Sequence, residues 1–210
     1  NNWFLMSYAL LFIFSLILFF QPGHGENKET EVQLNKKSLI KKMKQGGLVL
    51  YFRHASTEND YADQVKADVN DGSTQRVLSE KGWHEAVLIG RAIRFFDIPV
   101  EKVISSEYFR AWQTAWLAFG EYEKNPDLNF LPFADFNEEQ MEQMNKRITP
   151  YLSKKPKKHK NFVIVAHDDP FEAATGIYPE PQGVCFILEP KGGGKFQILG
   201  KIAPNEWMPW

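Results

Sequence analysis

Two histidines of this chain each follow a short apolar run, and the residues beside them have the types that phosphoryl transfer needs. The run LVLYF leads into Arg53 and His54, and the run FVIVA leads into His167 and Asp168. A histidine can attack an electrophile directly when a partner holds its other ring nitrogen. An arginine can bind phosphoryl oxygens through parallel N–H donors, and a carboxyl group can protonate the leaving oxygen. These residues therefore provide a nucleophile, a cation and an acid.

The apolar runs predict the strands that must position these residues. Runs of this length, rich in branched and aromatic side chains, are typical of strands that are covered on both faces in a parallel sheet. Ligands of open α/β sheets bind beyond the carboxyl ends of such strands. We therefore expect both histidines to lie in one crevice. Taken alone, His167 could equally be a core histidine bonded to the backbone.

Arg110 is the second cation that the sequence places near this crevice. Residues 103–106 predict a further strand, and Arg110 lies in the first turn of the helix that follows. A cation there opposes the helix dipole, and an anion bound at the same helix end would cancel that penalty. Without an anion, the side chain would instead turn toward solvent.

Periodic apolar residues and capping residues predict the remaining elements. Ser79 and Asn137 are typical N-caps, and a glycine run at 192–194 separates two strand-like segments. Helices are expected at 38–44, from 80 to about 97, at 107–119 and from 138 to about 152, with hairpin strands at 184–188 and 196–202. The polar residues 55–76 are expected to form a long loop beside the site. This order of elements is typical of an α/β domain.

The beginning of the chain differs in composition from the rest. Residues 3–20 are apolar apart from two serines, and the segment QPGHG follows them. This pattern is typical of a secretory signal peptide or of a membrane anchor. We expect residues 1–25 to be that leader, residues 26–37 to be a polar tether and residues 38–210 to form one domain. The protein is then exported to the periplasm or the extracellular space, either released or anchored through residues 3–20.

Charge and cysteine content narrow the function classes. The chain has 25 basic and 26 acidic residues and a formal net charge of −1, which gives no global attraction to nucleic acid. We therefore expect no nucleic-acid partner, and the composition carries no signal for an oligomeric state. Cys185 is the only cysteine, which excludes an intrachain disulfide, and its apolar surroundings predict a buried thiol.

Four segments in order resemble the histidine phosphatase superfamily, also called phosphoglycerate-mutase-like. RHA at 53–55 resembles the Arg-His-Gly signature of the family, with Ala55 in the glycine place. The other matches are LSEKG at 78–82, SSEYFRAWQTA at 105–115, which resembles Ser-Ser-x-x-x-Arg-Ala-x-x-Thr-Ala, and VAH at 165–167. Together they span about residues 48–187, which is nearly all of the chain after the leader.

The resemblance implies a fold and a set of roles. The fold is a three-layer α/β/α arrangement with a mostly parallel central sheet and the C-terminal β-hairpin at its edge. His54 is implied to be the nucleophile that is transiently phosphorylated, while Arg53, Arg110 and His167 surround the phosphoryl group. Thr57 occupies a place where many members carry a threonine near the phosphate. The activity implied is that of an exported, metal-independent phosphomonoesterase with a small phosphorylated substrate and no cofactor.

The general acid differs between branches of this superfamily. In one branch an acidic residue follows the second histidine directly, and here that residue is Asp168. In the other branch the acid lies in a loop between the helix of Arg110 and the next helix, where this chain offers Asp135 and Glu138. We expect Asp168 to be the acid.

Three other interpretations compete with a phosphatase. A phosphate-binding or scaffolding module would keep the pocket with little turnover, and Ala55 leaves room for it. A mutase is disfavoured because export separates it from cytosolic sugar phosphates. A metal site of His54, His167 and Asp168 lacks a close pair of ligands on one helix or loop. Asp60 and Asp63, in the long loop, would repel highly phosphorylated substrates unless they turn away.

Overall fold

A six-stranded sheet forms the centre of the protein. The computed structural model describes residues 33–59, 63, 67–131 and 137–208. The strands are β1 (Val49–Arg53), β2 (Val100–Ser105), β3 (Glu123–Lys124), β4 (Asn161–Ala166), β5 (Cys185–Gly192) and β6 (Lys195–Ile202). Their order across the sheet is β3-β2-β4-β1-β5-β6. β1 to β4 pair in parallel, whereas β5 and β6 form an antiparallel hairpin at one edge. The expected mostly parallel sheet with a hairpin at its edge is confirmed.

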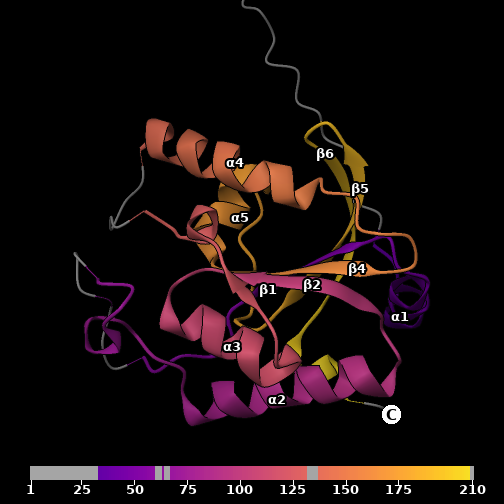
Figure 1. Ribbon diagram of the computed structural model, residues 1–210, viewed down its shortest axis with the longest axis horizontal. Coiled ribbons are helices and arrows are strands. Elements are labelled where there is room, and N and C mark those ends of the chain that lie inside the picture. The colour runs from indigo at the N-terminus through magenta and orange to yellow at the C-terminus, as the bar shows by residue number, and fades with distance from the viewer. Residues whose placement is uncertain (1–32, 60–62, 64–66, 132–136, 209–210) are drawn as a thin grey trace, which may run out of the picture.

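Helices cover both faces of this sheet (Figure 1). They are α1 (Lys36–Gln45), α2 (Glu80–Phe95), α3 (Phe109–Phe119), α4 (Glu138–Leu152) and α5 (Asp168–Thr175). Apolar residues of α1, α2 and α3 share one core with the sheet, and those of α4 and α5 share the other. The arrangement is therefore the expected three-layer α/β/α fold.

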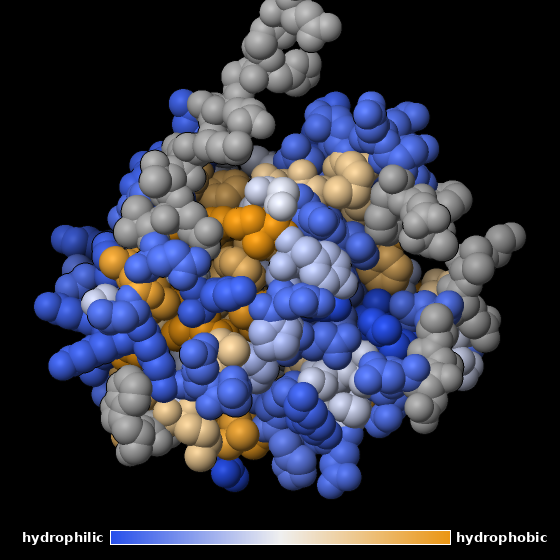
Figure 2. All heavy atoms as spheres, turned by 180° about the vertical axis from the view of Figure 1, so that it is seen from behind, coloured by the Kyte–Doolittle hydropathy of each residue, from blue (hydrophilic) through white to orange (hydrophobic). Residues whose placement is uncertain are grey.

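The central strands show why their sequences are continuously apolar. In β1 every residue is buried, because alternate side chains enter opposite cores. Leu50 and Phe52 pack on the side of α1 to α3, and Val49 and Tyr51 pack on the side of α4 and α5. The thiol of Cys185 is also buried, as its apolar surroundings predicted. The surface seen from behind is mostly hydrophilic, with the largest group of apolar residues left of the centre of the view (Figure 2).

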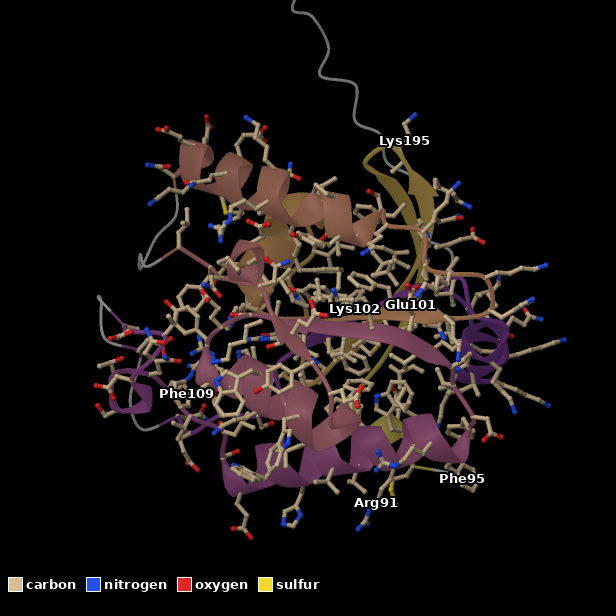
Figure 3. The ribbon with its side chains drawn as sticks, in the orientation of Figure 1. Arg91, Phe95, Glu101, Lys102, Phe109 and Lys195 are labelled. Atoms are coloured by element: carbon tan, nitrogen blue, oxygen red, sulfur yellow. The ribbon has the colours of Figure 1, made fainter. Side chains whose placement is uncertain are left out.

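The helices follow the amphipathic pattern and the caps that the sequence carries. The Ser79 side chain accepts a hydrogen bond from the backbone of Gly82 at the start of α2. On the outer side of α2, Arg91 and Phe95 point away from the sheet (Figure 3). α4 begins with a capping box, in which Asn137 and Gln140 satisfy each other's backbone N–H groups. These caps set the helix starts close to the expected positions.

Two elements are not predicted by the sequence pattern. β3 has only two residues, both exposed, and the Lys102–Glu123 ion pair of 2.6 Å joins it to β2. α5 has eight residues and is too short for a clear apolar period. It forms because acidic residues occupy its positive N-terminal end and Gly176 ends it in a left-handed conformation.

The leader expected at residues 1–25, including residues 3–20, lies outside the described residues. Within the described ranges, none of the helices is both apolar enough and long enough to cross a bilayer. α1 begins at Lys36, slightly before the expected domain boundary, and the backbone N–H of Leu34 already donates to Leu199 in β6 at 2.8 Å.

A close backbone contact joins the end of β1 to the start of α2 and so positions the site. The Ser56 carbonyl accepts hydrogen bonds from the backbone N–H and the hydroxyl of Ser79, at 3.0 and 3.1 Å. Gly82 lies against the same carbonyl, and a Cβ there would approach the Ser56 oxygen to 1.9 Å. The glycine of the LSEKG motif is therefore required by this close approach.

We expect Gly82→Ala to destabilise the protein by about 1–3 kcal/mol, the usual cost of forcing an extra methyl group into a packed site. The sign is informative, because alanine at an uncrowded helical position would instead stabilise by up to about 1 kcal/mol. Urea unfolding of both proteins at pH 7.5 measures the difference. An unfolding free energy equal to or above that of the wild type would contradict the role assigned to this contact.

Candidate active site

The two histidines and two arginines meet at the carboxyl ends of β1, β2 and β4. Arg53 ends β1 and pairs with Ala166 at the end of β4, so His54 and His167 come out of the sheet side by side. Their ring centroids are 5.5 Å apart. Arg110 lies in the first turn of α3, which follows β2. These four residues are at most 5% exposed, so their side chains are largely removed from bulk water.

One ring nitrogen of His54 has a lone pair that is available for reaction. Its Nδ1 lies 2.9 Å from the Ala55 carbonyl oxygen, which can only accept, so Nδ1 carries the proton. Its Nε2 is buried and has no hydrogen-bond partner among the described residues. Burial, and then the charge of Arg110, hold the pKa of His54 well below its ordinary value. The ring is therefore neutral, with Nε2 available as a nucleophile.

Arg53 is held by several acceptors around its guanidinium. Nη1 donates to the Pro179 carbonyl at 3.0 Å, and Nη2 donates to Asp168 Oδ2 at 2.5 Å. The Tyr178 hydroxyl donates to the same carboxylate oxygen at 2.6 Å. The Nε of Arg53 is buried and has no partner within the described part of the chain. Arg53 thus links Asp168 to the crevice and keeps one donor unused.

Arg110 is engaged by a carboxylate of the long loop. Nη1 and Nη2 donate to Asp63 Oδ1 and Oδ2, both at 2.9 Å, and Oδ1 also accepts from the backbone N–H of Arg76 at 2.7 Å. This parallel fork is the geometry in which arginine also binds a phosphoryl group. Burial lowers the pKa of Arg110 and the charge of Asp63 opposes that shift, so Asp63 compensates the buried cation. Asp63 does not turn away from the site, and Asp60 lies outside the described residues.

His167 is held by a hydroxyl group and packed by aromatic rings. Its Nε2 lies 2.7 Å from Ser106 Oγ, while its Nδ1 is buried with no partner in the described ranges. Burial, then the charge of Arg110, keep the pKa of His167 well below its ordinary value. The rings of Tyr108 and Phe130 lie at centroid distances of 5.3 and 4.8 Å. His167 is therefore also neutral and presents one nitrogen without a partner.

Solved phosphatase structures share this architecture. The protein histidine phosphatase SixA, complexed with tungstate, matches with a TM-score of 0.52 and 14% identity over 75% of this chain and 97% of that one. A phosphoserine phosphatase mutant from Entamoeba histolytica, in complex with phosphoserine, matches with a TM-score of 0.58 and 14% identity. The match covers 77% of this chain and 99% of that one. A mycobacterial glucosyl-3-phosphoglycerate phosphatase with VO3 matches with a TM-score of 0.54 and 15% identity, over 73% of this chain and 97% of that one. This chain has the histidine phosphatase fold. No family model and no curated protein matches it.

Of the candidate acids of this histidine phosphatase fold that the structure describes, Asp168 is the one at the site. It is the first residue of α5 and contacts Arg53. Glu138 is exposed in the first turn of α4, and Asp135 lies outside the described residues. The loop after α3 instead brings Phe130 to the site, where its ring lies 5.2 Å from the Arg110 guanidinium.

Asp169 is a further carboxyl group, which follows Asp168 in the first turn of α5. Its pKa is raised to about 6, first by burial and then by the charges of Asp168 and Glu172. Among the described contacts Asp169 has no hydrogen bond to Arg53, whereas Asp168 accepts one from Arg53 Nη2, so geometry favours Asp168 as the acid.

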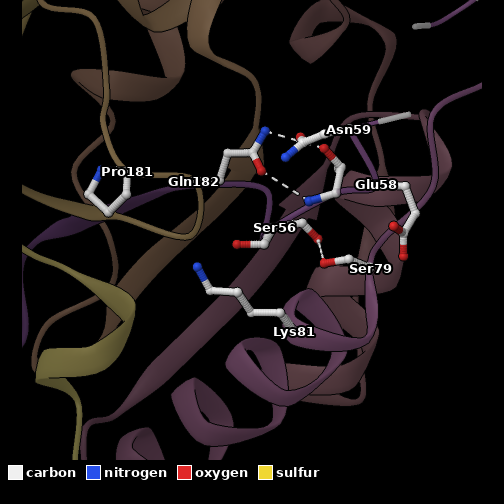
Figure 4. Close-up of a pocket in the computed structure, with 8 residues that line it drawn as sticks. Ser56, Glu58, Asn59, Ser79, Lys81, Pro181 and Gln182 are labelled. Atoms are coloured by element: carbon white, nitrogen blue, oxygen red, sulfur yellow. Dashed lines mark hydrogen bonds between the residues drawn. The ribbon is translucent and has the colours of Figure 1, made fainter. Parts of the chain in front are cut away.

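Thr57 lines a cavity that adjoins the one reaching Arg53. Its backbone N–H donates to Gln182 Oε1 at 3.0 Å, and its hydroxyl accepts from Gln182 Nε2 at 3.3 Å (Figure 4). Both residues line a polar cavity of about 430 Å³, together with Asn59 and Lys81 (Figure 4). An adjoining cavity of about 550 Å³ reaches Arg53. Among the described contacts none joins Thr57 to an arginine, and its place near the phosphate stays a prediction.

The described side chains also bear on the metal-site alternative. Within the described ranges, no three or more His, Cys, Asp or Glu side chains are grouped so that they could hold a metal ion. His54 and His167 each already use one ring nitrogen in a hydrogen bond.

We expect Asp63→Asn to raise the affinity for phosphate or vanadate by roughly tenfold or more. The carboxylate competes with an anion for Arg110, and hydrogen bonds to charged groups are worth about 1.5–3 kcal/mol. Isothermal titration at pH 7.5 measures the two affinities. Asp71→Asn is a matched control, since Asp71 lies in the same loop and accepts hydrogen bonds from Ser73. Unchanged or weaker anion binding by Asp63→Asn would show that Asp63 does not compete.

Proposed function

We propose that this protein is a phosphatase that hydrolyses a small phosphate monoester through a phosphohistidine on His54. The observation that carries the proposal is the buried Nε2 of His54. It is the unprotonated nitrogen of a neutral ring and has no hydrogen-bond partner among the described residues. It lies beside His167 and Arg110, whose positions suit the oxygens of one tetrahedral anion. Two of the solved phosphatases hold oxyanions, tungstate and VO3, which supports the proposal.

In the first step, His54 Nε2 forms a bond to phosphorus while the bond from phosphorus to the leaving oxygen breaks. Asp168, in its protonated form, gives its proton to that oxygen, so the alcohol departs neutral. A phosphohistidine and an Asp168 carboxylate remain. Arg53 stabilises that carboxylate through the 2.5 Å ion pair, and the arginines bind the phosphoryl oxygens.

In the second step, water attacks the phosphorus of the phosphohistidine. The Asp168 carboxylate accepts the proton of that water, the bond between phosphorus and Nε2 breaks, and its electron pair returns to the ring. Inorganic phosphate leaves, and His54 and Asp168 are back in their starting protonation states. The hydrogen bond from Nδ1 to the Ala55 carbonyl orients the ring in both steps.

The leaving group is proposed to occupy the polar cavities next to Arg53. Asn59 and Gln182 line both cavities, and none of the described residues that line them is aromatic. Amide side chains there suit a leaving group with hydroxyl or amine substituents. The phosphoserine in one of the solved phosphatases is a small polar ester of this kind.

The enzyme is further proposed to act outside the cytosol. The support is the apolar segment at residues 3–20, which suits a signal peptide or an anchor. Fractionation of cells that express the full chain, followed by N-terminal sequencing, would distinguish a released protein from an anchored one.

We expect His54→Ala to reduce hydrolysis of an aryl phosphate to background, because the nucleophile is lost. Assays are run with a chelator present, and 32P-labelled substrate with rapid acid-free quenching detects the phosphohistidine in the wild type only. His84→Ala is a matched control, since His84 is exposed on α2. Equal rates for His54→Ala and the wild type would remove the proposal. Tight vanadate binding with negligible turnover in the wild type would favour a phosphate-binding module instead.

We expect Asp168→Asn to slow hydrolysis of an alkyl phosphate such as phosphoserine by about 10²–10⁴, the usual contribution of a general acid. Hydrolysis of an aryl phosphate with a good leaving group should fall much less, because that oxygen leaves without a proton. Comparing kcat for the two substrates separates this role from a structural one. If Asp168 only positioned Arg53, both rates would fall by the same factor. Asp169→Asn serves as the control.

A further inference from the structure

We propose that Asn129 and Glu107 are positioning residues that fix the tautomer of His167 through Ser106, and that the site consequently selects the monoanion of its phosphate ester. The statement about the monoanion rests on the proposed phosphatase activity, whereas the statement about the tautomer does not. Neither Asn129 nor Glu107 was singled out from the sequence.

The orientation of the Asn129 amide is determined by its two contacts with Glu107. Asn129 Oδ1 accepts from the backbone N–H of Glu107 at 2.9 Å, and Asn129 Nδ2 donates to Glu107 Oε2 at 2.8 Å. A backbone N–H can only donate and a carboxylate can only accept. A flipped amide would lose both hydrogen bonds. Oδ1 is therefore the atom that faces Ser106.

This orientation assigns the proton of the Ser106 hydroxyl. Ser106 Oγ lies 2.8 Å from Asn129 Oδ1, an acceptor, so the hydroxyl must donate there. Ser106 Oγ also accepts from the backbone N–H of Tyr108 at 3.2 Å. A hydroxyl has one proton and two lone pairs, so a single lone pair of Ser106 is left for His167.

His167 must then donate to Ser106 through Nε2, at 2.7 Å. Because the ring is neutral, Nδ1 is the unprotonated nitrogen, and it is buried without a partner among the described residues. The two histidines are thus held in opposite tautomers: the lone pair is on Nε2 in His54 and on Nδ1 in His167.

A lone pair on Nδ1 selects between the ionic forms of the substrate. A phosphate monoester loses its second proton with a pKa of about 6. The monoanion keeps one P–OH group, which can donate to His167 Nδ1, whereas the dianion has only acceptors and would meet the lone pair unpaired. During transfer to His54 that proton stays with the phosphoryl group or moves to Nδ1, while the leaving oxygen takes its proton from Asp168.

The pH dependence of kcat/KM for an aryl phosphate tests this proposal, because its good leaving group makes the rate insensitive to the acid. For the wild type we expect kcat/KM to fall about tenfold per pH unit above the second pKa of the substrate. This fall is the alkaline limb of the pH profile. For a second aryl phosphate, whose second pKa differs, the limb should shift along the pH axis by the difference between the two pKa values. In Asn129→Ala the Ser106 hydroxyl can donate to His167 Nε2, so Nδ1 can carry a proton and donate it in a hydrogen bond to an oxygen of the dianion.

We therefore expect the alkaline limb of Asn129→Ala to move upward by roughly one pH unit or more. Glu107→Gln keeps an acceptor for Asn129 Nδ2 and should retain the wild-type profile. Asn125→Ala is the control for loop disruption, since the Asn125 side chain caps a short helical turn in the same loop. A uniform loss of rate in Asn129→Ala, with the limb unmoved, would reduce Asn129 to a structural role and overturn the proposal.

The tautomer is measured directly by long-range 1H–15N correlation spectra of 15N-histidine-labelled protein, with His167→Gln to assign the signals. The wild type should show a protonated Nε2 and a pyridine-like Nδ1 for His167, and Asn129→Ala should lose this pattern. A protonated Nδ1 in the wild type would overturn the proposal whatever the activity. Absence of hydrolysis together with the expected spectrum would instead remove the proposed function and leave the positioning role standing.

Discussion

Two imidazoles lie buried among arginine side chains, and every feature of the site depends on their staying neutral. Burial removes each ring from water and the charge of Arg110 repels a proton, so the pKa values of His54 and His167 are both held well below the ordinary value. A protonated ring would have no lone pair for attack or for accepting a hydrogen bond. β1 and β4 place the two histidines in the protein interior, because each strand is buried along its whole length.

The same constraint explains which groups hold the two rings. The Ala55 carbonyl accepts from His54, and the Ser106 hydroxyl accepts from His167. A carboxylate in either place would attract a second proton and favour the imidazolium. Neutral acceptors fix the tautomer without that effect. The carboxylates of the site, Asp63 and Asp168, contact the arginines instead.

The sequence predicts those parts of the site that burial and local geometry determine. Strands covered on both faces leave continuous apolar runs, which is why the positions of His54 and His167 follow from the pattern. The contacts of Asp63 and Asn129 leave no such signal. Asp63 reaches Arg110 across 47 residues and Asn129 reaches Ser106 across 23, so only the tertiary fold brings these polar pairs together. Side chains in irregular loops carry no period that would mark them in advance.

The charges of the site connect the loop carboxylate to the ionic form of the substrate. Without a ligand, Arg53 is paired with Asp168 and Arg110 is paired with Asp63, so each buried cation has one negative partner. A monoanion that displaces Asp63 from Arg110 exchanges one negative charge for another and leaves this balance unchanged. Before Asp168 takes up the proton that it later gives to the leaving oxygen, a dianion would add a second negative charge beside that carboxylate and two neutral imidazoles. In an enclosed site such an excess is poorly screened, so the electrostatics favour the same ionic form as the lone pair of His167.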